Sequence, residues 1–491
     1  MIDPKDTVHN GNIVDLQLAP RNAQGLVEYS MDFYILAPVD QTKSNHKVFV
    51  EPVNRGSKLF GLFNGSTGGN NPTTAANAGD AFLMNQGYTM VWVGWEPNLV
   101  ARTSAGPALS MGLTAPVAKN ADGSSITGPD YEYIEFDNAT TTSYTTAYNT
   151  NTTDTTKASL TVKQHLTDPP VTIPSTGWQW TSANTIALLP AGTAFQQSAI
   201  YELTFTAKDP VIGGVGFVGI RDFVSFLRNA ATDTAGTANP IAVGTPSRFV
   251  TWTLSQPARL MNDFIWLGFN QDVKGKQVFD GVFNWVGAGD GIGLNYRFEQ
   301  SGRTERNRQN KLYPEAPFPF SYTTLTDPFT GKIDGRNIRC TSTNTCPKIM
   351  NIDSANEYWV KAGSLLHSDL TGNDVADPAN VRNYLISSSQ HASPSAANSL
   401  GVCQQFQNPT DQNPALRALF VALDQWIDGT APPPSMVPRR SDGTGVLTQT
   451  TAQSTLGIGV VPQAALGWPT IPGVLYTGLV TIRDRLDFGT Q

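Results

Sequence analysis

The chain has 491 residues, of which 15% are charged, and its formal net charge is −7. No cluster of basic residues accompanies this acidic balance, which argues against nucleic acid as a partner. No run of about 18 apolar residues occurs, so the sequence predicts no membrane span. The histidines are not paired at helical spacing and no CxxC motif occurs, so we expect neither a metal nor another cofactor. The alternative is a calcium site in a loop, built from the scattered carboxylates. The length suits two or three domains, or one α/β core enlarged by insertions.

The cysteines and the polar composition favour an exported protein. Cys340 and Cys346 are separated by a short polar loop, which predicts a disulfide and leaves Cys403 free or able to compete. The chain begins with a polar segment, MIDPKDTVHNGN, and Thr, Asn, Ser and Gly are abundant. We therefore expect a secreted or periplasmic protein whose signal peptide has been removed. The alternative is three unpaired thiols.

Residues 1–99 are typical of the first part of an α/β core. An alternating strand is predicted over 27–36 and a second strand over 46–53. A short helix is predicted over 80–86. The continuous apolar segment over 87–95 suits a strand in the middle of a parallel sheet.

Residues 100–200 differ from the rest because they are poor in helix formers and rich in Thr, Asn and Gly. Their β propensity is nevertheless high. Trp178, Trp180, Ile186 and Leu188 supply apolar side chains that a folded unit could bury. We therefore predict an exposed β-rich insertion rather than a linker.

The α/β pattern is expected to resume after the insertion. The predicted elements are a strand over 201–207, a helix over 219–230, a strand over 249–252, a helix over 258–267 and a strand over 278–286. The glycines of GGVGFVGIRDF (213–223) are interpreted as a close approach of helix and sheet, because the segment lacks the Lys-Ser/Thr of a phosphate-binding loop.

The chain is expected to be irregular over 287–339. A long irregular segment inside a compact domain is usually functional, so this one is predicted to form a lid or pocket wall. A strand over 348–352 and an amphipathic helix over 414–427 follow it. The predicted organisation is the first part of the core over 1–99, a β-rich insertion over 100–200, core with the candidate nucleophile over 201–290, a lid or pocket-wall region over 291–346, and core with the acid and base plus a C-terminal extension over 347–491.

Ser255 lies between a predicted strand and a predicted helix. A serine on such a tight turn exposes its Oγ, and the next backbone N–H, that of Gln256, can stabilise an oxyanion. The usual nucleophile elbow has glycine two residues before and two after the serine, where this chain has Thr253 and Pro257. Proline is tolerated in the first turn of a helix, whereas the threonine must find room. The alternative is that Ser255 is a helix N-cap.

A serine nucleophile needs a histidine base. His391 follows a short apolar segment and lies in a loop just past a predicted strand. A strand-then-loop context of this kind is where α/β-hydrolases place their base. The alternative for His391 is an ordinary surface loop. His367, in GSLLHSD, is expected to line the pocket or cap a helix.

Three carboxylates follow the strand over 348–352, namely Asp353, Glu357 and Asp369. Position within the loop favours Glu357 or Asp353 as the acid, and spacing does not choose between them. The order serine, acid, histidine along the chain is that of α/β-hydrolases. The predicted fold is therefore an α/β-hydrolase fold, with a mostly parallel central sheet flanked by helices.

The turn Asn54-Arg55-Gly56-Ser57 follows the predicted strand over 46–53. Hydrolases of this kind place their second oxyanion N–H here, and glycine permits the backbone conformation that exposes it. The candidate donors are Gly56 and Ser57. The alternative is an ordinary turn.

The chain resembles a family of bacterial α/β-hydrolase-domain proteins that are serine esterase-like. The resembling stretches are VNRG (53–56), GYTMVWVGW (87–95), DPVIGGVGFVGIRDFVSFLR (209–228), LSQPARLMNDFIWLGFN (254–270), FDGVFNWVGAG (279–289), SANEYW (354–359), SLLHSD (364–369) and QH (390–391). The elbow of that family reads like GxSQSGR. Ser255, Gln256 and Arg259 match it, while Thr253, Pro257 and Ala258 depart from it.

The resemblance implies that the acid is Glu357, the glutamate before Tyr-Trp, and that the base is His391. It also implies hydrolysis of a small-molecule or polymeric carboxylic ester through an acyl-enzyme. Candidate substrate-binding residues are Trp359, His367, Arg259 and Trp95. The alternatives are a non-catalytic ligand-binding protein on a hydrolase scaffold, or an amide or carbon–carbon bond hydrolase with the same triad.

Overall fold

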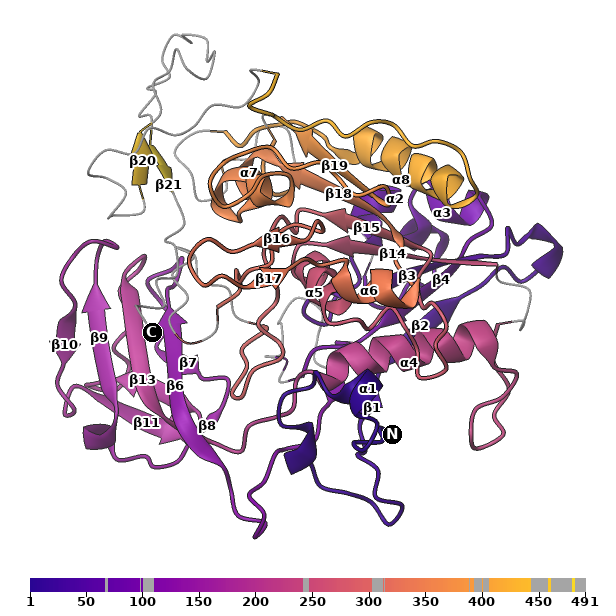
Figure 1. The fold of residues 1–491 in the computed structure, drawn as a ribbon. Coiled ribbons are helices and arrows are strands. Elements are labelled where there is room, and N and C mark those ends of the chain that lie inside the picture. The colour runs from indigo at the N-terminus through magenta and orange to yellow at the C-terminus, as the bar shows by residue number, and fades with distance from the viewer. Residues whose placement is uncertain are drawn as a thin grey trace.

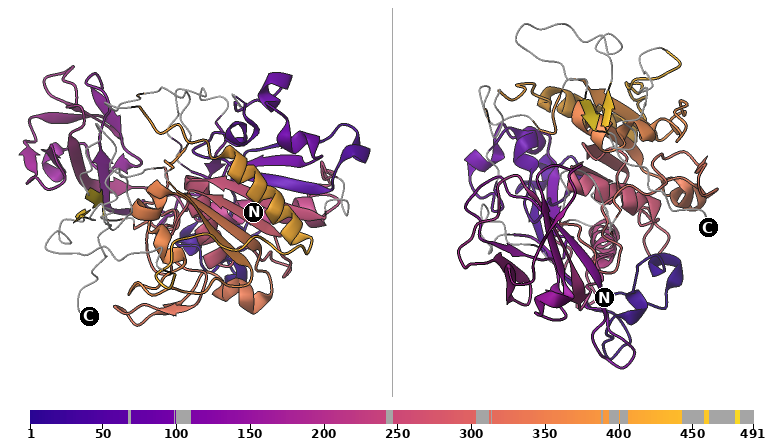
Figure 2. Two further views of the ribbon diagram at one scale, coloured as in Figure 1. Left: turned by 90° about the horizontal axis from the view of Figure 1, so that it is seen from above. Right: turned by 90° about the vertical axis from the view of Figure 1, so that its left-hand side faces the viewer.

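The computed structural model describes residues 1–66, 69–97, 99, 110–241, 247–302, 312, 314–387, 389–392, 400, 406–442, 458–460 and 479–481. Figure 1 shows the described chain as a helix-flanked sheet with a separate group of strands beside it, and Figure 2 shows the same arrangement from two further sides.

A seven-stranded sheet forms the centre of the molecule, with the order β19-β18-β15-β14-β3-β4-β2. Its strands are β2 (Phe33–Leu36), β3 (Lys47–Pro52), β4 (Thr89–Val93), β14 (Arg248–Leu254), β15 (Gly281–Trp285), β18 (Lys348–Ser354) and β19 (Val381–Ile386). All neighbours are parallel except the edge strand β2, which is antiparallel to β4. The carboxyl ends of the parallel strands therefore lie at one edge, where ligands bind in open α/β sheets.

Helices cover both faces of this sheet (Figure 1), so its central strands are buried on both sides and read as apolar runs. One apolar cluster joins a sheet face to α4 (Val215–Asn229) and α5 (Gln256–Trp266). The second joins the other face to α2 (Phe60–Asn64), α3 (Phe82–Asn85) and α8 (Asn413–Ile427).

The approach of α4 to the sheet depends on a glycine. A Cβ at Gly216 would lie 2.4 Å from the backbone oxygen of Trp95, a separation too short for two non-bonded atoms. This bears out the interpretation of the glycine-rich segment as a packing device. The helix begins at Val215, four residues before the predicted start.

The region between β4 and α4 contains two small antiparallel sheets. One has the order β10-β9-β13-β6 with β8 added to β13, and the other has the order β11-β12-β7. The strands are β6 (Thr127–Ile134), β7 (Ser143–Thr145), β8 (Asn149–Thr150), β9 (Ser159–Lys163), β10 (Val171–Ile173), β11 (Trp178–Ser182), β12 (Thr185–Leu188) and β13 (Ile200–Lys208). They enclose an apolar core of their own, which includes Trp178, Ile186 and Leu188.

The strand predicted over 201–207 is present as β13, but the expectation that it returns to the α/β core is wrong. It pairs with β6 and β9 in the inserted sheet, and the core resumes with α4. Alternation of side chains predicts a half-buried strand without specifying which sheet it joins.

The other elements are short. They are α1 (Thr7–Asn10), η1 (Leu16–Leu18), β1 (Ser30–Met31), η2 (Gln41–Lys43), η3 (Ala75–Ala78), β5 (Leu113–Thr114), η5 (Thr155–Lys157), β16 (Leu325–Thr326), β17 (Ile333–Asp334), α6 (Ile338–Thr343), α7 (Ala355–Val360), η6 (Gly363–Leu366), β20 (Ile458–Val460) and β21 (Leu479–Thr481). The predicted disulfide is present and links Cys340 in α6 to Cys346, just before β18. Cys403 lies outside the described residues.

The strand predicted over 27–36 is divided into β1 and β2 at Asp32. The backbone of Asp32 bonds to Gly94 and Gly112, and its carboxylate accepts a further hydrogen bond from the Gly112 N–H. β1 consequently pairs with β5 instead of with the central sheet.

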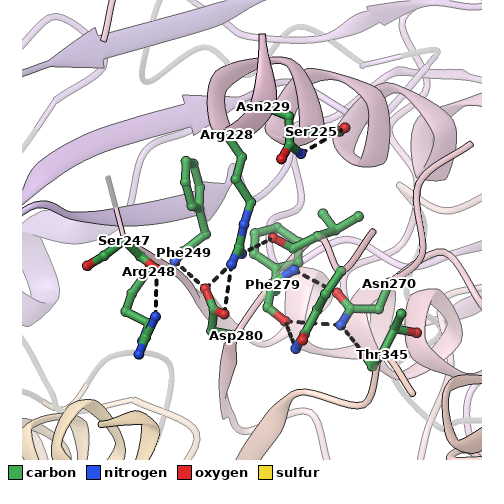
Figure 3. Close-up of polar contacts among 12 residues, drawn as sticks. Ser225, Arg228, Asn229, Ser247, Arg248, Phe249, Asn270, Phe279, Asp280 and Thr345 are labelled. Carbon is green, nitrogen blue, oxygen red and sulfur yellow. Dashed lines mark hydrogen bonds and ion pairs between the residues drawn. The ribbon is translucent and has the colours of Figure 1, made fainter. Parts of the chain in front are cut away.

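Polar contacts fix the amino ends of β14 and β15 (Figure 3). The Asp280 carboxylate accepts two hydrogen bonds from the Arg228 guanidinium, at 2.8 and 2.9 Å, and one from the backbone N–H of Phe249, at 2.8 Å. Asn270 donates to the carbonyl oxygens of Phe279 and Thr345. α4 is thereby joined to the sheet at the end opposite Ser255.

Candidate active site

Ser255 occupies a strained turn between β14 and α5. Its backbone has φ 65° and ψ −107°, a conformation that L residues rarely adopt and that clusters at functional sites. The backbone N–H donates to the Trp285 carbonyl oxygen at 2.8 Å, which holds the turn against β15. The Oγ makes no capping hydrogen bond to α5, and the residue is partly exposed. Ser255 thus occupies the N-cap position of α5 without capping it through its side chain, and this geometry is the one expected of a nucleophile elbow.

The two departures from the usual elbow pattern are accommodated. Thr253 is fully buried, and its Oγ donates to the side-chain oxygen of Asn284 on β15 at 2.7 Å. Pro257 lies in the first turn of α5, where its missing N–H has no intrahelical acceptor to lose. The glycine that permits close packing against α5 is Gly287, because a Cβ there would lie 2.7 Å from the Cβ of Ala258.

Glu357 and His391 are brought together from two loops at the carboxyl edge of the sheet. Glu357 lies in α7, directly after β18, and His391 follows β19. The His391 Nδ1 is 2.5 Å from the Glu357 Oε1. A histidine that donates from Nδ1 to a carboxylate keeps its Nε2 as the proton acceptor. The His391 side chain is 42% exposed, whereas the Glu357 side chain is fully buried.

The carboxylate of Glu357 is held as an anion. Burial acts to raise its pKa, but the hydrogen bond and charge of His391, the charge of Lys361 and the Ser354 hydroxyl together lower it to about 2. The Lys361 Nζ is 3.7 Å from Oε1, and the Ser354 hydroxyl donates to Oε2.

Asp353, the other candidate acid, is in a different state. It is buried at the end of β18, where its Oδ1 accepts a hydrogen bond from the Ala288 N–H at 3.0 Å. Burial and the neighbouring charge of Glu357 raise its pKa to about 7. The geometry therefore favours Glu357 as the partner of His391.

Gln412, which the sequence analysis did not single out, fixes the loop that carries His391. It is fully buried at the start of α8. Its Nε2 donates to the Gln390 carbonyl oxygen at 2.7 Å, and its Oε1 accepts from the Trp285 indole N–H at 3.0 Å. Its sequence context, just before a helix, gives no signal of this role.

Two sites offer backbone N–H groups beside Ser255. Gln256 is the first residue of α5, and the first N–H groups of a helix have no intrahelical acceptor. The turn after β3 has positive φ at Arg55 (47°) and Gly56 (78°). The Ser57 N–H donates to the Asn54 carbonyl oxygen at 2.9 Å, so Gly56 is the better candidate donor in that turn.

The four predicted substrate-binding residues lie in varied environments. Trp95 is fully buried, and its indole N–H donates to the Val53 carbonyl oxygen at 2.7 Å. Arg259 is buried in an ion pair with Glu315 at 2.5 Å. The buried ring of His367 lies against Tyr358, 3.2 Å from its hydroxyl, and burial lowers the pKa of His367 to about 4. The backbone of Trp359 belongs to α7, and its side chain lies outside the described residues.

Within the part of the chain that the structure describes, no group of three or more His, Cys, Asp or Glu side chains is arranged to hold a metal ion. The described helices include none long and apolar enough to cross a membrane.

Comparison with known proteins identifies the family of this chain. The sequence model of the alpha/beta hydrolase domain family matches residues 215–470, just over half of the chain. That range contains Ser255, Glu357 and His391. Searches of curated proteins and of solved structures found no match. The sheet order, the elbow and the matched range agree, and the chain belongs to the alpha/beta hydrolase domain family.

Proposed function

We propose that the protein is a serine hydrolase that cleaves a carboxylic ester through an acyl-enzyme. The observation that carries this proposal is the short contact between the ionised, buried Glu357 and His391, at the same sheet edge as the strained Ser255 turn. Burial of a carboxylate costs folding free energy, so stability alone does not account for a buried carboxylate bonded to an exposed imidazole. A histidine general base requires this arrangement.

In the first half of the reaction, the His391 Nε2 removes the proton from the Ser255 Oγ as that oxygen attacks the ester carbonyl carbon. Glu357 keeps the imidazole in the correct tautomer and stabilises the imidazolium that forms. The negative charge that develops on the carbonyl oxygen is met by the backbone N–H groups of Gln256 and Gly56. The imidazolium then protonates the leaving alcohol, and the acyl group remains on Ser255.

In the second half, His391 removes a proton from water, and the resulting hydroxide attacks the acyl-enzyme carbonyl carbon. The second oxyanion forms in the same place, and its collapse returns the proton to Ser255 and releases the carboxylic acid. No cofactor is needed for either half.

The access route and the location of the protein belong to the same proposal. Within 291–346, the residues that the structure describes are assigned to a wall or lid of the site. His367, whose ring lies against Tyr358, and Trp359, the next residue along the chain, are assigned to the substrate side. The disulfide at the end of this region fits a secreted or periplasmic protein, where thiols oxidise.

The test is hydrolysis of a series of p-nitrophenyl esters, from acetate to decanoate, by the wild type and by Ser255→Ala. We expect turnover of at least one ester by the wild type and a loss of about 1,000-fold or more in the variant, with the fold retained. Equal rates for the two proteins across esters would overturn the proposal. Faster turnover of the matching p-nitroanilides would mean that the substrate is an amide and not an ester.

A further inference from the structure

We propose that the side chain of Gln256 is a positioning group that aligns the two halves of the oxyanion hole. This inference rests on the proposed function, because it assigns a role within the same site. The backbone N–H of Gln256 is one candidate donor to the oxyanion. Its carboxamide bonds to the turn that carries the other donor.

The carboxamide is fully buried and joins three loops at the carboxyl edge of the sheet. Its Oε1 accepts the backbone N–H of Arg55 at 3.1 Å. Its Nε2 donates to the Glu96 Oε1 at 2.9 Å and to the Ser301 carbonyl oxygen at 2.8 Å. One side chain thus bonds the turn after β3, the loop after β4 and the segment after β15 to the elbow after β14.

A second contact runs between the same two segments in the opposite direction. The Nδ2 of Asn54 donates to the Leu254 carbonyl oxygen at 3.0 Å, in a buried environment. Leu254 and Gln256 are the neighbours of Ser255 on either side. The turn is therefore attached to the elbow both before and after the nucleophile.

These contacts determine the orientation of one peptide group. Gln256 fixes the peptide N–H of Arg55, and the Asn70 Nδ2 fixes the Gly56 carbonyl oxygen at 2.7 Å. The peptide that lies between them carries the Gly56 N–H. Its direction is set from both sides, so that this N–H is aimed before substrate arrives.

Preorganised donors contribute to catalysis only when they point at the oxyanion, and small misplacements are costly. Loss of the carboxamide should therefore weaken stabilisation of the tetrahedral intermediate while leaving ground-state binding almost unchanged. A residue that served only the core would change stability without this selectivity.

The test variant is Gln256→Met, which keeps the backbone N–H and the side-chain length but removes all three hydrogen bonds. The matched control is Asn262→Leu on the same helix. Asn262 is also a buried carboxamide, and its Nδ2 donates to the carbonyl oxygens of Ala288 and Asp290. Its hydrogen bonds run to Ala288, Asp290, Asn284 and Tyr322, away from the turn of residues 54–57.

Two readouts are compared, namely ester kinetics and amide hydrogen exchange of a peptide that covers residues 53–58. In Gln256→Met we expect kcat to fall by about 10- to 100-fold, KM to change by less than about threefold, and a trifluoromethyl ketone to bind more weakly by the same factor as kcat. Exchange over residues 53–58 should become faster. Asn262→Leu should lower the unfolding midpoint but leave kcat and this exchange as in the wild type.

Unchanged exchange over residues 53–58 in Gln256→Met would overturn the positioning role, and so would an equal loss of kcat in Asn262→Leu. If the wild type hydrolyses no ester, the proposed function fails. The exchange comparison still decides whether Gln256 holds the turn.

Discussion

At the scale of the residue, the backbone conformation of Ser255 lowers stability but exposes the side chain that the proposed chemistry uses. Its positive φ places the side chain at the tip of the turn, and such conformations cost a non-glycine residue about 1–3 kcal/mol. Glycine adopts positive φ without this cost.

Ser255→Gly should therefore raise the free energy of unfolding by about 1 kcal/mol while abolishing hydrolysis. Ser255→Ala should abolish hydrolysis without this gain, because alanine meets the same steric restriction. Chemical denaturation of the three proteins measures the difference. Equal midpoints for the glycine and alanine variants would mean that the turn is not strained.

The two neighbouring carboxyl groups, Glu357 and Asp353, should respond differently to neutralisation. Glu357→Gln removes the anion that orients His391, and we expect kcat to fall by about 1,000-fold or more. Asp353→Asn keeps the oxygen that accepts the Ala288 N–H, so kcat should stay within about threefold of the wild type at pH 7. A larger loss of kcat in Asp353→Asn than in Glu357→Gln would mean that Asp353, and not Glu357, orients His391.

The pH dependence of stability tests the protonation state of Asp353. The pKa of Asp353 is about 7 in the folded protein against 3.8 ordinarily, so the folded state keeps a proton that the unfolded chain has lost. The free energy of unfolding contributed by this group therefore falls as pH rises from about 4 to about 7. Asp353→Asn should flatten that part of the profile and be more stable than the wild type at pH 8. Parallel profiles for the two proteins would contradict the assignment.

The sequence allowed some of these residues to be predicted and not others. The chain has only five histidines, and residue order together with the family resemblance pointed to Ser255, Glu357 and His391 as candidates. The neighbours that hold them, such as Gln412 and Asn54, are common amides whose partners lie far away in the chain. Local pattern carries no information about such pairs. Arg259 matches the family motif, yet it is buried with Glu315, and burial was not readable from the motif.

At the scale of the element, strands and helices with strong periodicity were predicted well, because burial on one or both faces produces the pattern. β3, β4, β14, α5 and α8 lie within a few residues of their predicted bounds. The break at Asp32 was missed because its cause is pairing with Gly94 and Gly112, which are remote in sequence. The partner strands of β13 were missed for the same reason.

The junction of α4 with β14 and β15 gives a prediction at this scale. Asp280→Ala leaves the Phe249 N–H without its acceptor and the Arg228 guanidinium with only the Val278 carbonyl oxygen, and we expect the free energy of unfolding to fall by about 2–4 kcal/mol. Asp280→Asn keeps one acceptor oxygen and should lose less. Since this junction lies at the amino ends of the strands, kcat per folded molecule should not change. Wild-type stability of Asp280→Ala would show that the contacts contribute nothing.

At the scale of the whole molecule, the chain that follows β15 of the hydrolase core contributes an aromatic side chain to the inserted sheets. Phe298, from the segment after β15, is buried in the apolar core of the insertion and lies edge-to-face with Tyr148 at a centroid distance of 5.2 Å. The two parts are thereby coupled through packing and not only through the chain connections.

Phe298→Ala should destabilise the insertion by about 3 kcal/mol, since it removes a buried ring from a packed core. We expect calorimetry to show an earlier transition for the insertion, separated from that of the core. Phe329→Ala is the control, because Phe329 is 62% exposed and should leave the trace unchanged. A single transition at the wild-type temperature for Phe298→Ala would show that the two parts are not coupled here.

The central claim is that Ser255 is a nucleophile activated by His391 and Glu357. The most direct measurement is reaction of the folded protein with an active-site fluorophosphonate, followed by mass mapping of the labelled peptide. The account predicts one label, on Ser255, that is lost in His391→Ala and strongly slowed in Glu357→Gln. A label on another residue, or an undiminished label on Ser255 in His391→Ala, would contradict it.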